Sequence, residues 1–222
     1  MVLNDIHIHK LIRSNRKTIG LEIHPGGALV VRIPHSLRLE KLEGFLVKKR
    51  KWIQQKQDLA RKKTRPEPTF AHGQKFLFLG RYYPLRFKNV SRFTFDDAFY
   101  MPQHEQPKAR VLFIAWYKRQ ARAHIGARTE HLAGKIHISY SKVTITSAAK
   151  RWGSCSANGN LNFPYRLVMA PPPVIDYVIV HELIHILERN HAKPYWEKVE
   201  TAMPDYKKYK AWLKDHGHLL VI

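Results

Sequence analysis

The sequence has very little cysteine: Cys155 is the only one among 222 residues. A single thiol excludes a disulfide within the chain and also excludes a zinc site built from several cysteines. Disulfide-stapled secreted scaffolds are therefore excluded. We expect a protein of the reducing cytoplasm, in which Cys155 is a buried packing residue rather than a nucleophile.

Long apolar runs are also missing. No stretch approaches the roughly 20 apolar residues that a membrane-spanning helix needs, and residues 1–10 lack the apolar region of a signal peptide. We therefore expect no membrane partner. The chain is 44% hydrophobic, which is enough to bury a full core as one larger domain or as two packed halves.

Acidic side chains are scarce, since 17 Asp and Glu stand against 39 Lys and Arg. Residues 1–70 carry 16 basic and 6 acidic side chains, residues 71–150 carry 14 and 4, and residues 151–222 carry 9 and 7. This basic field would attract polyanions, so nucleic acid and nucleotides are candidate partners of the N-terminal region. The alternative is that basic runs such as 48–51 and 61–63 are solvated faces of a helix.

One motif carries most of the functional information: His181-Glu182-Leu183-Ile184-His185. On a helix, His181 and His185 lie one turn apart on the same face, so both imidazoles can bind a single ion. Glu182 points about 100° round from His181, beside the metal. There it can take a proton from a water whose pKa a zinc ion lowers to roughly 7, and pass it to the leaving group. The motif therefore predicts a zinc-dependent hydrolase with Glu182 as general base.

The residues around this motif are apolar on nearly all sides, as in a helix buried in a core. Histidine and glutamate in such a helix cost several kcal/mol unless they are paired or bind a metal, which favours a ligand role. The alternative is a pair of hydrogen-bonded core histidines with Glu182 at the helix surface. The apolar residues are Val174, Ile175, Tyr177, Val178, Ile179, Val180, Leu183, Ile186 and Leu187.

Catalytic zinc usually takes three protein ligands, so a third is needed. Asn190 tolerates the left-handed conformation that ends helices, and a reversal there would return His191 to the metal. Glu200 is the other candidate, because residues 194–202 begin with a proline and predict a second helix that could supply a carboxylate. From these residues alone, either His191 or Glu200 could be the third ligand.

A hairpin is predicted just before the metal helix. Residues 152–155 can pair with residues 161–163 across Asn158-Gly159, a strong turn signal. An exposed strand edge there could hold an extended peptide, and Pro164 fits only an edge or a bulge. Arg151 and Arg166 flank these strands and are candidate substrate-binding residues, although a structural salt bridge to Asp176 or Glu188 is an equal alternative.

Several motifs together resemble the YgjP-like metal-dependent hydrolase family, which is similar to the SprT-like and minigluzincin zinc peptidases. The resemblance implies that His181, His185 and His191 are zinc ligands and that Glu182 is the general base. It is dense over residues 142–213 and looser before them. The motifs are Arg13-Ser14-Asn15-Arg16-Lys17, Trp52-Ile53, Leu79-Gly80-Arg81, Lys150-Arg151-Trp152-Gly153-Ser154-Cys155-Ser156, Gly159-Asn160, Arg166-Leu167, Ala170-Pro171-Pro172, Asp176-Tyr177-Val178, the histidine motif itself, Asn190-His191 and Tyr195-Trp196.

The hydrophobic pattern predicts an α+β fold. We expect a zincin-like catalytic domain over residues 107–222, with its active-site helix packed on a small sheet. A basic, strand-rich region with one long helix precedes it over residues 1–106, and Arg65-Pro66-Glu67-Pro68 is the best linker. Strands are expected at 18–24, 28–33, 75–79, 82–87, 92–95, 98–101 and 142–146, and helices at 37–62 and 107–132.

Three functions fit the sequence. The first is a zinc peptidase with one Zn²⁺ per chain and a peptide or protein substrate, although histidine ligands also suit Ni²⁺, Co²⁺ and Cu²⁺. The second is a metal-dependent phosphohydrolase acting on nucleotides. The third is a nucleic-acid-binding protein whose zinc only holds the fold. We expect the first.

Overall fold

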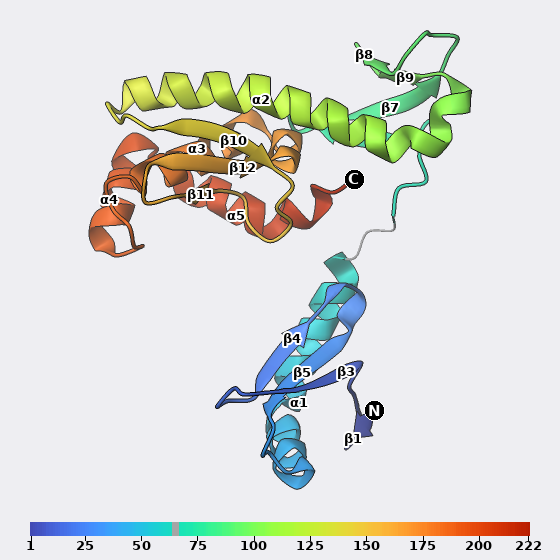
Figure 1. Ribbon diagram of the computed structural model, residues 1–222, viewed down its shortest axis with the longest axis vertical. Helices are drawn as coiled ribbons and strands as arrows, with labels where there is room; N and C mark the ends of the chain where they lie inside the picture. The colour runs from blue at the N-terminus through green and yellow to red at the C-terminus, as the bar shows by residue number, and fades with distance from the viewer. Residues whose placement is uncertain (64–66) are drawn as a thin grey trace. The chain divides into compact units, whose positions relative to one another are not determined.

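A computed structural model describes residues 1–63 and 67–222. The chain forms two compact units, residues 1–66 and 67–222 (Figure 1). The first two residues of the predicted linker, Arg65 and Pro66, lie outside the described residues. The compact units divide the chain at residue 66, whereas the sequence pattern placed the boundary after residue 106.

The first unit is a three-stranded sheet with one long helix. The strand order is β3 (Lys10–Ser14), β5 (Leu29–Pro34) and β4 (Gly20–Ile23), and α1 (Leu39–Lys63) follows β5. Strands β4 and β5 pair antiparallel across the turn Pro25–Gly27, so the strands predicted at 18–24 and 28–33 form a hairpin. The sequence pattern missed β3, which pairs parallel with β5, and the short pair β1 (Val2–Leu3) and β2 (Ile6–His7).

Apolar residues join the helix of the first unit to its sheet. Leu29, Val31 and Ile33 alternate along β5 and are fully buried, as expected for one face of a strand. Leu42 and Leu46 lie one helical turn apart on α1 and complete this small core. The predicted amphipathic helix at 37–62 is thereby confirmed, apart from its first two residues.

The second unit contains two small sheets and one helix that reaches both. The four-stranded sheet has the order β6 (Lys75–Phe78), β7 (Arg81–Phe87), β9 (Phe99–Met101), β8 (Thr94–Phe95), and the three-stranded sheet has the order β10 (Lys142–Thr146), β12 (Asn160–Pro164), β11 (Ser154–Cys155). The helix α2 (Ala109–Lys135) runs along both sheets (Figure 1). A 3₁₀ turn at Gln103–Lys108 leads into it, so Pro107 lies before the helix rather than at its start.

One continuous core explains why the second unit begins so early in the chain. Phe76 and Phe99 from the four-stranded sheet pack on Phe113 and Trp116 of α2, and Phe163 of the other sheet belongs to the same cluster. Residues 67–106 therefore share their core with α2 and with the strands beyond it. Aromatic packing across the sequence, which local patterns do not encode, decides the division.

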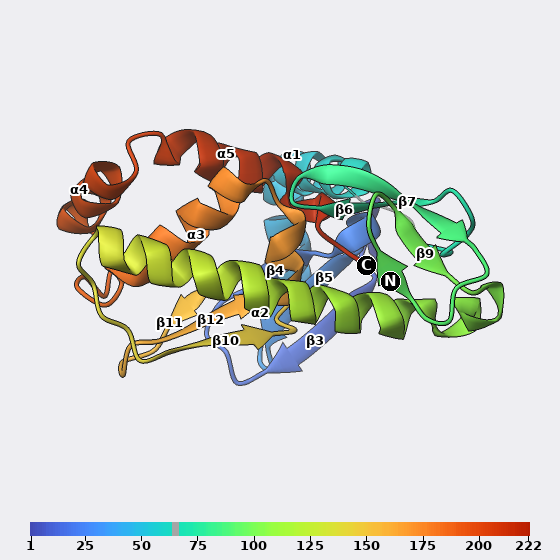
Figure 2. The ribbon, with the colours of Figure 1, turned by 90° about the horizontal axis from the view of Figure 1, so that it is seen from above.

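The remaining helices follow the second sheet. They are α3 (Pro172–Ile184), α4 (Lys193–Ala202) and α5 (Tyr206–His216), with short 3₁₀ turns at Tyr165–Met169 and Gly217–Leu219. Helix α3 lies between α2 and α5 and also contacts β11 (Figure 2). The α+β fold, with the helix that carries the histidine motif packed on a small sheet, is thus confirmed.

The predicted hairpin before α3 is also confirmed. Ser154 pairs with Asn162 and Cys155 with Leu161, in antiparallel register across the Asn158-Gly159 turn. However, β12 is the central strand of its sheet, because β10 pairs with its other side. The expectation that Pro164 marks an edge was therefore wrong: Pro164 is the last residue of a central strand, where the missing N–H interrupts no further ladder. The edge strand beside α3 is β11.

Within the described part of the chain, no helix is both long and apolar enough to cross a membrane.

Candidate metal centre

Helix α3 places His181 and Glu182 near its end. Two prolines at its start suit the first turn of a helix, whose N–H groups have no partner there. The helix ends at Ile184, but His185 keeps helical dihedral angles (φ −64°, ψ −14°). His181 and His185 therefore retain the one-turn spacing that the motif predicted.

The chain after His185 returns His191 by a different route from the one expected. Asn190 is not among the residues with positive φ, so the left-handed reversal predicted there was wrong. Instead, the Asn190 side-chain oxygen accepts a hydrogen bond from the Ala192 N–H at 3.0 Å, which closes a local turn. Arg189 anchors the segment, because its guanidinium donates to the carbonyls of Ser156 (2.8 Å) and Ala157 (2.9 Å) in the β11–β12 turn. The sequence pattern did not single out Arg189.

The three histidines meet through their Nε2 atoms. His191 Nε2 lies 3.1 Å from His185 Nε2 and 3.2 Å from His181 Nε2. One ligand atom from each ring lies within 4.8 Å of the others, so the triad can hold a metal ion. Ligands of one tetrahedral zinc, at bonds of 2.0–2.1 Å, would lie about 3.3 Å apart, which is close to the observed spacing.

Neighbouring groups fix the orientation of these rings. The Glu188 carbonyl lies 3.0 Å from His185 Nδ1, which leaves Nε2 as the nitrogen that could bind a metal. The Tyr195 hydroxyl donates to the His181 carbonyl at 3.0 Å, and its ring stacks on His185. Trp196 stacks on His191. Both aromatic residues come from α4, so this helix supports the triad without supplying a ligand.

Glu200, the other candidate for the third ligand, lies elsewhere. Its carboxylate accepts from Lys207 Nζ at 2.9 Å and it is not part of the histidine group. Of the two alternatives that the sequence left open, the structure brings His191 to His181 and His185. The reason is the short turn anchored by Arg189.

Two of the three histidines have lowered pKa values. Desolvation, followed by the neighbouring His185 and His191, lowers the pKa of His181 to about 3. Burial and His185 also lower the pKa of His191. Neutral imidazole is the form that binds metals, so the lowered pKa values of His181 and His191 favour metal binding.

Glu182 lies beside the triad and is almost fully buried, with 5% of its surface exposed. Burial raises the pKa of Glu182 to about 7, although the charge of Arg151 opposes this rise. A carboxyl group with this pKa can both accept and return a proton near neutral pH. The alternative that places Glu182 at the helix surface is therefore excluded.

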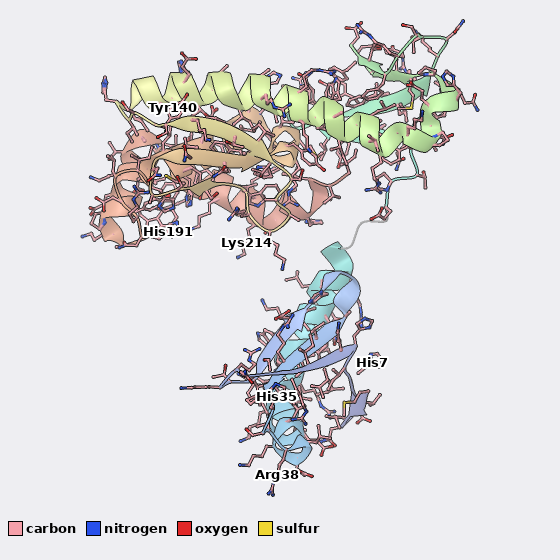
Figure 3. The ribbon with its side chains drawn as sticks, in the orientation of Figure 1. His7, His35, Arg38, Tyr140, His191 and Lys214 are labelled. Carbon is pink, nitrogen blue, oxygen red and sulfur yellow. The ribbon has the colours of Figure 1, made fainter. Side chains whose placement is uncertain are left out.

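A pocket of about 400 Å³ opens next to Glu182 and His181. Arg151, Lys210 and Lys214 line it, together with apolar side chains such as Trp152. Lys214 and His191 both belong to the second unit (Figure 3). Glu182 is the only acidic residue that lines the pocket within the described chain, so the pocket suits a substrate that carries negative charge.

The two arginines predicted to bind substrate have different positions. Arg151 lines the pocket, whereas Arg166 lies over the Trp152 ring at 4.5 Å and donates to the Ala149 carbonyl. Arg166 thus contacts Trp152, a residue that lines the pocket, but does not line the pocket itself. Neither forms the salt bridge considered for it, because Asp176 pairs with Arg128 and Glu188 pairs with Lys198.

A histidine triad and a buried glutamate, on a helix that packs on a small sheet, are the features of a metallopeptidase domain. The chain belongs to the YgjP-like family: the family model described as "YgjP-like, metallopeptidase domain" matches residues 17–216.

Two solved structures resemble part of the chain. The metallopeptidase zymogen abylysin of Pyrococcus abyssi is 18% identical, with a TM-score of 0.37, and the match covers 40% of this chain and 93% of abylysin. The metallopeptidase zymogen jannalysin of Methanocaldococcus jannaschii is 17% identical, with a TM-score of 0.37, and the match covers 41% of this chain and 94% of jannalysin. No protein of curated function matches the chain significantly.

Proposed function

We propose that this chain is a zinc-dependent peptidase, with His181, His185 and His191 as metal ligands and Glu182 as general base. The position of Glu182 carries the proposal: it is buried beside the triad, and its pKa is raised to about 7. A metal ion held by the three rings would supply Lewis acidity, which acidifies water and polarises a carbonyl group.

Each residue then has a defined role. The Glu182 carboxylate takes the proton of the attacking water and gives it to the amine that leaves. The three neutral rings supply nitrogen donors without charge, so the site keeps the positive charge of the ion. Burial of Glu182 keeps bulk water away from the proton that it carries. The positive charge of Arg151 favours the ionised carboxylate, which is the form that acts as a base.

The substrate is expected to lie along β11 and in the pocket beside Glu182. An extended peptide can add to a strand edge by main-chain hydrogen bonds. Arg151, Lys210 and Lys214 would then favour an acidic side chain on the peptide. We propose that the protein acts in the cytoplasm, in keeping with its single cysteine.

The same three cations favour one second candidate, a metal-dependent phosphohydrolase acting on nucleotides. Phosphate groups and acidic peptides both carry the negative charge that this pocket suits. The two candidates share the metal, the general base and the pocket, and differ only in the bond that is cleaved.

Turnover by wild type and Glu182→Gln, each with its metal content measured, tests these assignments. We expect cleavage within a panel of unfolded proteins and acidic peptides, and a loss of at least about 100-fold in Glu182→Gln with metal retained. Phosphate release from nucleoside triphosphates, abolished by the same substitution, would favour the phosphohydrolase. If Glu182→Gln leaves every activity intact, the metal is structural and the enzyme assignment fails.

A further inference from the structure

A second pocket, far along the sequence from the metal site, lies within the first unit. Its volume is about 740 Å³, and Arg16, Lys17, Arg38 and Lys41 line it together with Pro34, Ser36 and Leu37. Volumes of this size are typical of ligand sites. Four cations and one hydroxyl line it, and none of the lining residues is acidic.

Strand topology brings these residues together. Strands β3 and β5 pair parallel, with Ser14 opposite Pro34, so their carboxyl ends lie at the same edge of the sheet. The loop after β3 supplies Arg16 and Lys17, and the loop after β5 supplies Ser36 and Arg38. Loops at the carboxyl ends of parallel strands commonly form binding sites. Arg38 lies where α1 begins (Figure 3), and a helix start favours anions.

One arginine outside the pocket holds its wall in place. Arg13 Nη1 donates to the carbonyls of His35 (2.7 Å) and Leu37 (3.0 Å). These hydrogen bonds satisfy two carbonyl oxygens of the loop with a donor from β3. The loop thereby keeps its shape around Ser36, and two of its acceptors point to Arg13.

The pocket cations have no acidic partners. Among the described residues, no carboxylate lies within 4.0 Å of Arg16, Lys17, Arg38 or Lys41. A neighbouring pocket of the same unit differs, because Asp5 and Asp58 line it beside its arginines. Positive charge without acidic partners is therefore specific to this pocket and is not shared by every pocket of the first unit.

Arg16 adds a specific signal. Its Nε is buried and has no hydrogen-bond acceptor within the described chain. A buried N–H without an acceptor is unfavourable, so this guanidinium is held without the partners that would compensate its charge. Gly20 leaves the space for this guanidinium, because a Cβ there would lie 2.6 Å from Arg16 Nη1.

We propose that this pocket binds a phosphate group, with Arg16, Lys17, Arg38 and Lys41 as its cationic contacts and Ser36 as a hydroxyl donor. Arginine binds phosphate oxygens through paired N–H donors, and lysine adds point charge. The phosphate can belong to a small phosphorylated molecule or to a nucleic-acid backbone. The site is separate from the proposed catalytic centre, so it stands or falls independently of the hydrolase assignment.

The test uses the full-length protein and two probes. Binding of inorganic pyrophosphate is measured by NMR of the backbone and arginine Nε–H groups. Binding of a fluorescent single-stranded oligothymidine is measured by fluorescence anisotropy. The pocket variant is Arg16→Gln with Arg38→Gln. A second variant, Arg38→Gln with Lys41→Gln, changes only exposed side chains and is therefore expected to fold as wild type does. The control, Lys48→Gln with Lys51→Gln, removes the same charge from exposed positions on α1 outside the pocket.

We expect saturable pyrophosphate shifts at residues 16, 17, 36, 38 and 41, and an affinity at least tenfold weaker in both pocket variants but within twofold of wild type in the control. If the phosphate belongs to nucleic acid, the oligothymidine responds in the same way, and its salt slope falls by about 1.4 for two lost contacts. Either response supports the site and identifies the source. Equal weakening by pocket and control variants in both titrations, or pyrophosphate shifts outside the pocket alone, would overturn it.

Discussion

A Cβ atom at Gly153 would lie 2.4 Å from Oε1 of Glu182 and 2.5 Å from its Cγ. No side chain fits there unless Glu182 moves. Gly153 belongs to the segment before β11, and Glu182 belongs to α3, so this contact fixes the distance between the hairpin and the helix. The glycine therefore sets the position of the proposed general base.

The first prediction concerns this contact. Gly153→Ala should displace Glu182 and lower turnover by about 100-fold, because a shift of about 1 Å in a catalytic group has effects of this size. The three atoms nearest to that Cβ all belong to Glu182 and none to a histidine, so metal content should stay at the wild-type value. Gly126→Ala is the matched control: no atom lies within 4 Å of its new Cβ, and alanine suits the interior of α2. Equal turnover in both variants would contradict the assignment.

The second prediction is a pH dependence of stability in protein treated with a chelator. The pKa of Glu182 is raised from 4.5 to about 7 in the folded state. Its contribution is therefore fully present below pH 4.5 and is lost as the pH rises through 7. Glu182→Gln carries no such titration. Relative to this variant, wild type should lose about 2 kcal/mol of unfolding free energy between pH 5 and pH 8.

Urea unfolding of both proteins at several pH values measures this difference. If the difference in unfolding free energy between wild type and Glu182→Gln stays constant across pH 5–8, the Glu182 carboxyl is not desolvated in the folded state.

The third prediction separates the two candidates for the third ligand. His191→Ala should lower the zinc content from about one per chain to a small fraction, because two histidines alone hold zinc weakly. Glu200→Gln should leave the zinc content unchanged, since Glu200 pairs with Lys207. Atomic absorption on dialysed protein gives both values. Loss of zinc in Glu200→Gln alone would move the third ligand to α4.

The fourth prediction concerns the support of the triad by Tyr195. Tyr195→Phe removes the hydrogen bond to the His181 carbonyl but keeps the stacking on His185. The free energy of unfolding should fall by about 1 kcal/mol, the usual contribution of one buried hydrogen bond. Tyr209→Phe is the control, because Tyr209 is only partly buried and should change stability by less than about 0.5 kcal/mol. Thermal or urea unfolding measures both, and equal losses would count against the role of the hydroxyl.

The fifth prediction addresses the ion pair that joins α2 to α3. Arg128 donates to both oxygens of Asp176, at 2.9 and 2.7 Å, and the Asp176 side chain is only 16% exposed. Asp176→Asn should lower the unfolding free energy by about 1–3 kcal/mol, since it leaves Arg128 without its anion. Asp58→Asn breaks an exposed pair with Arg61 and should cost less than about 0.5 kcal/mol. A double-mutant cycle with Arg128→Met isolates the pairwise energy.

Much of the fold follows from local patterns. The alternation in 28–33, the Asn158-Gly159 turn and the apolar run before His181 each depend on residues that are neighbours in sequence, so the strands, the hairpin and the helix could be predicted. The parallel pairing of β3 with β5 could not, because it joins strands that are separated by a third one. The sequence pattern placed a boundary after residue 106, whereas the compact units divide at residue 66, because aromatic packing on α2 joins residues 67–106 to the second unit.

The sequence by itself determined the two-histidine motif, the glutamate between its histidines and the basic charge of the N-terminal part, because helical spacing and composition need no tertiary information. Only the tertiary structure decided that His191 and not Glu200 joins the triad, that Gly153 holds Glu182, and that four cations of the first unit share one pocket. Those relationships connect residues on different elements. Their distances arise from packing and from anchors such as Arg189, which no local pattern specifies.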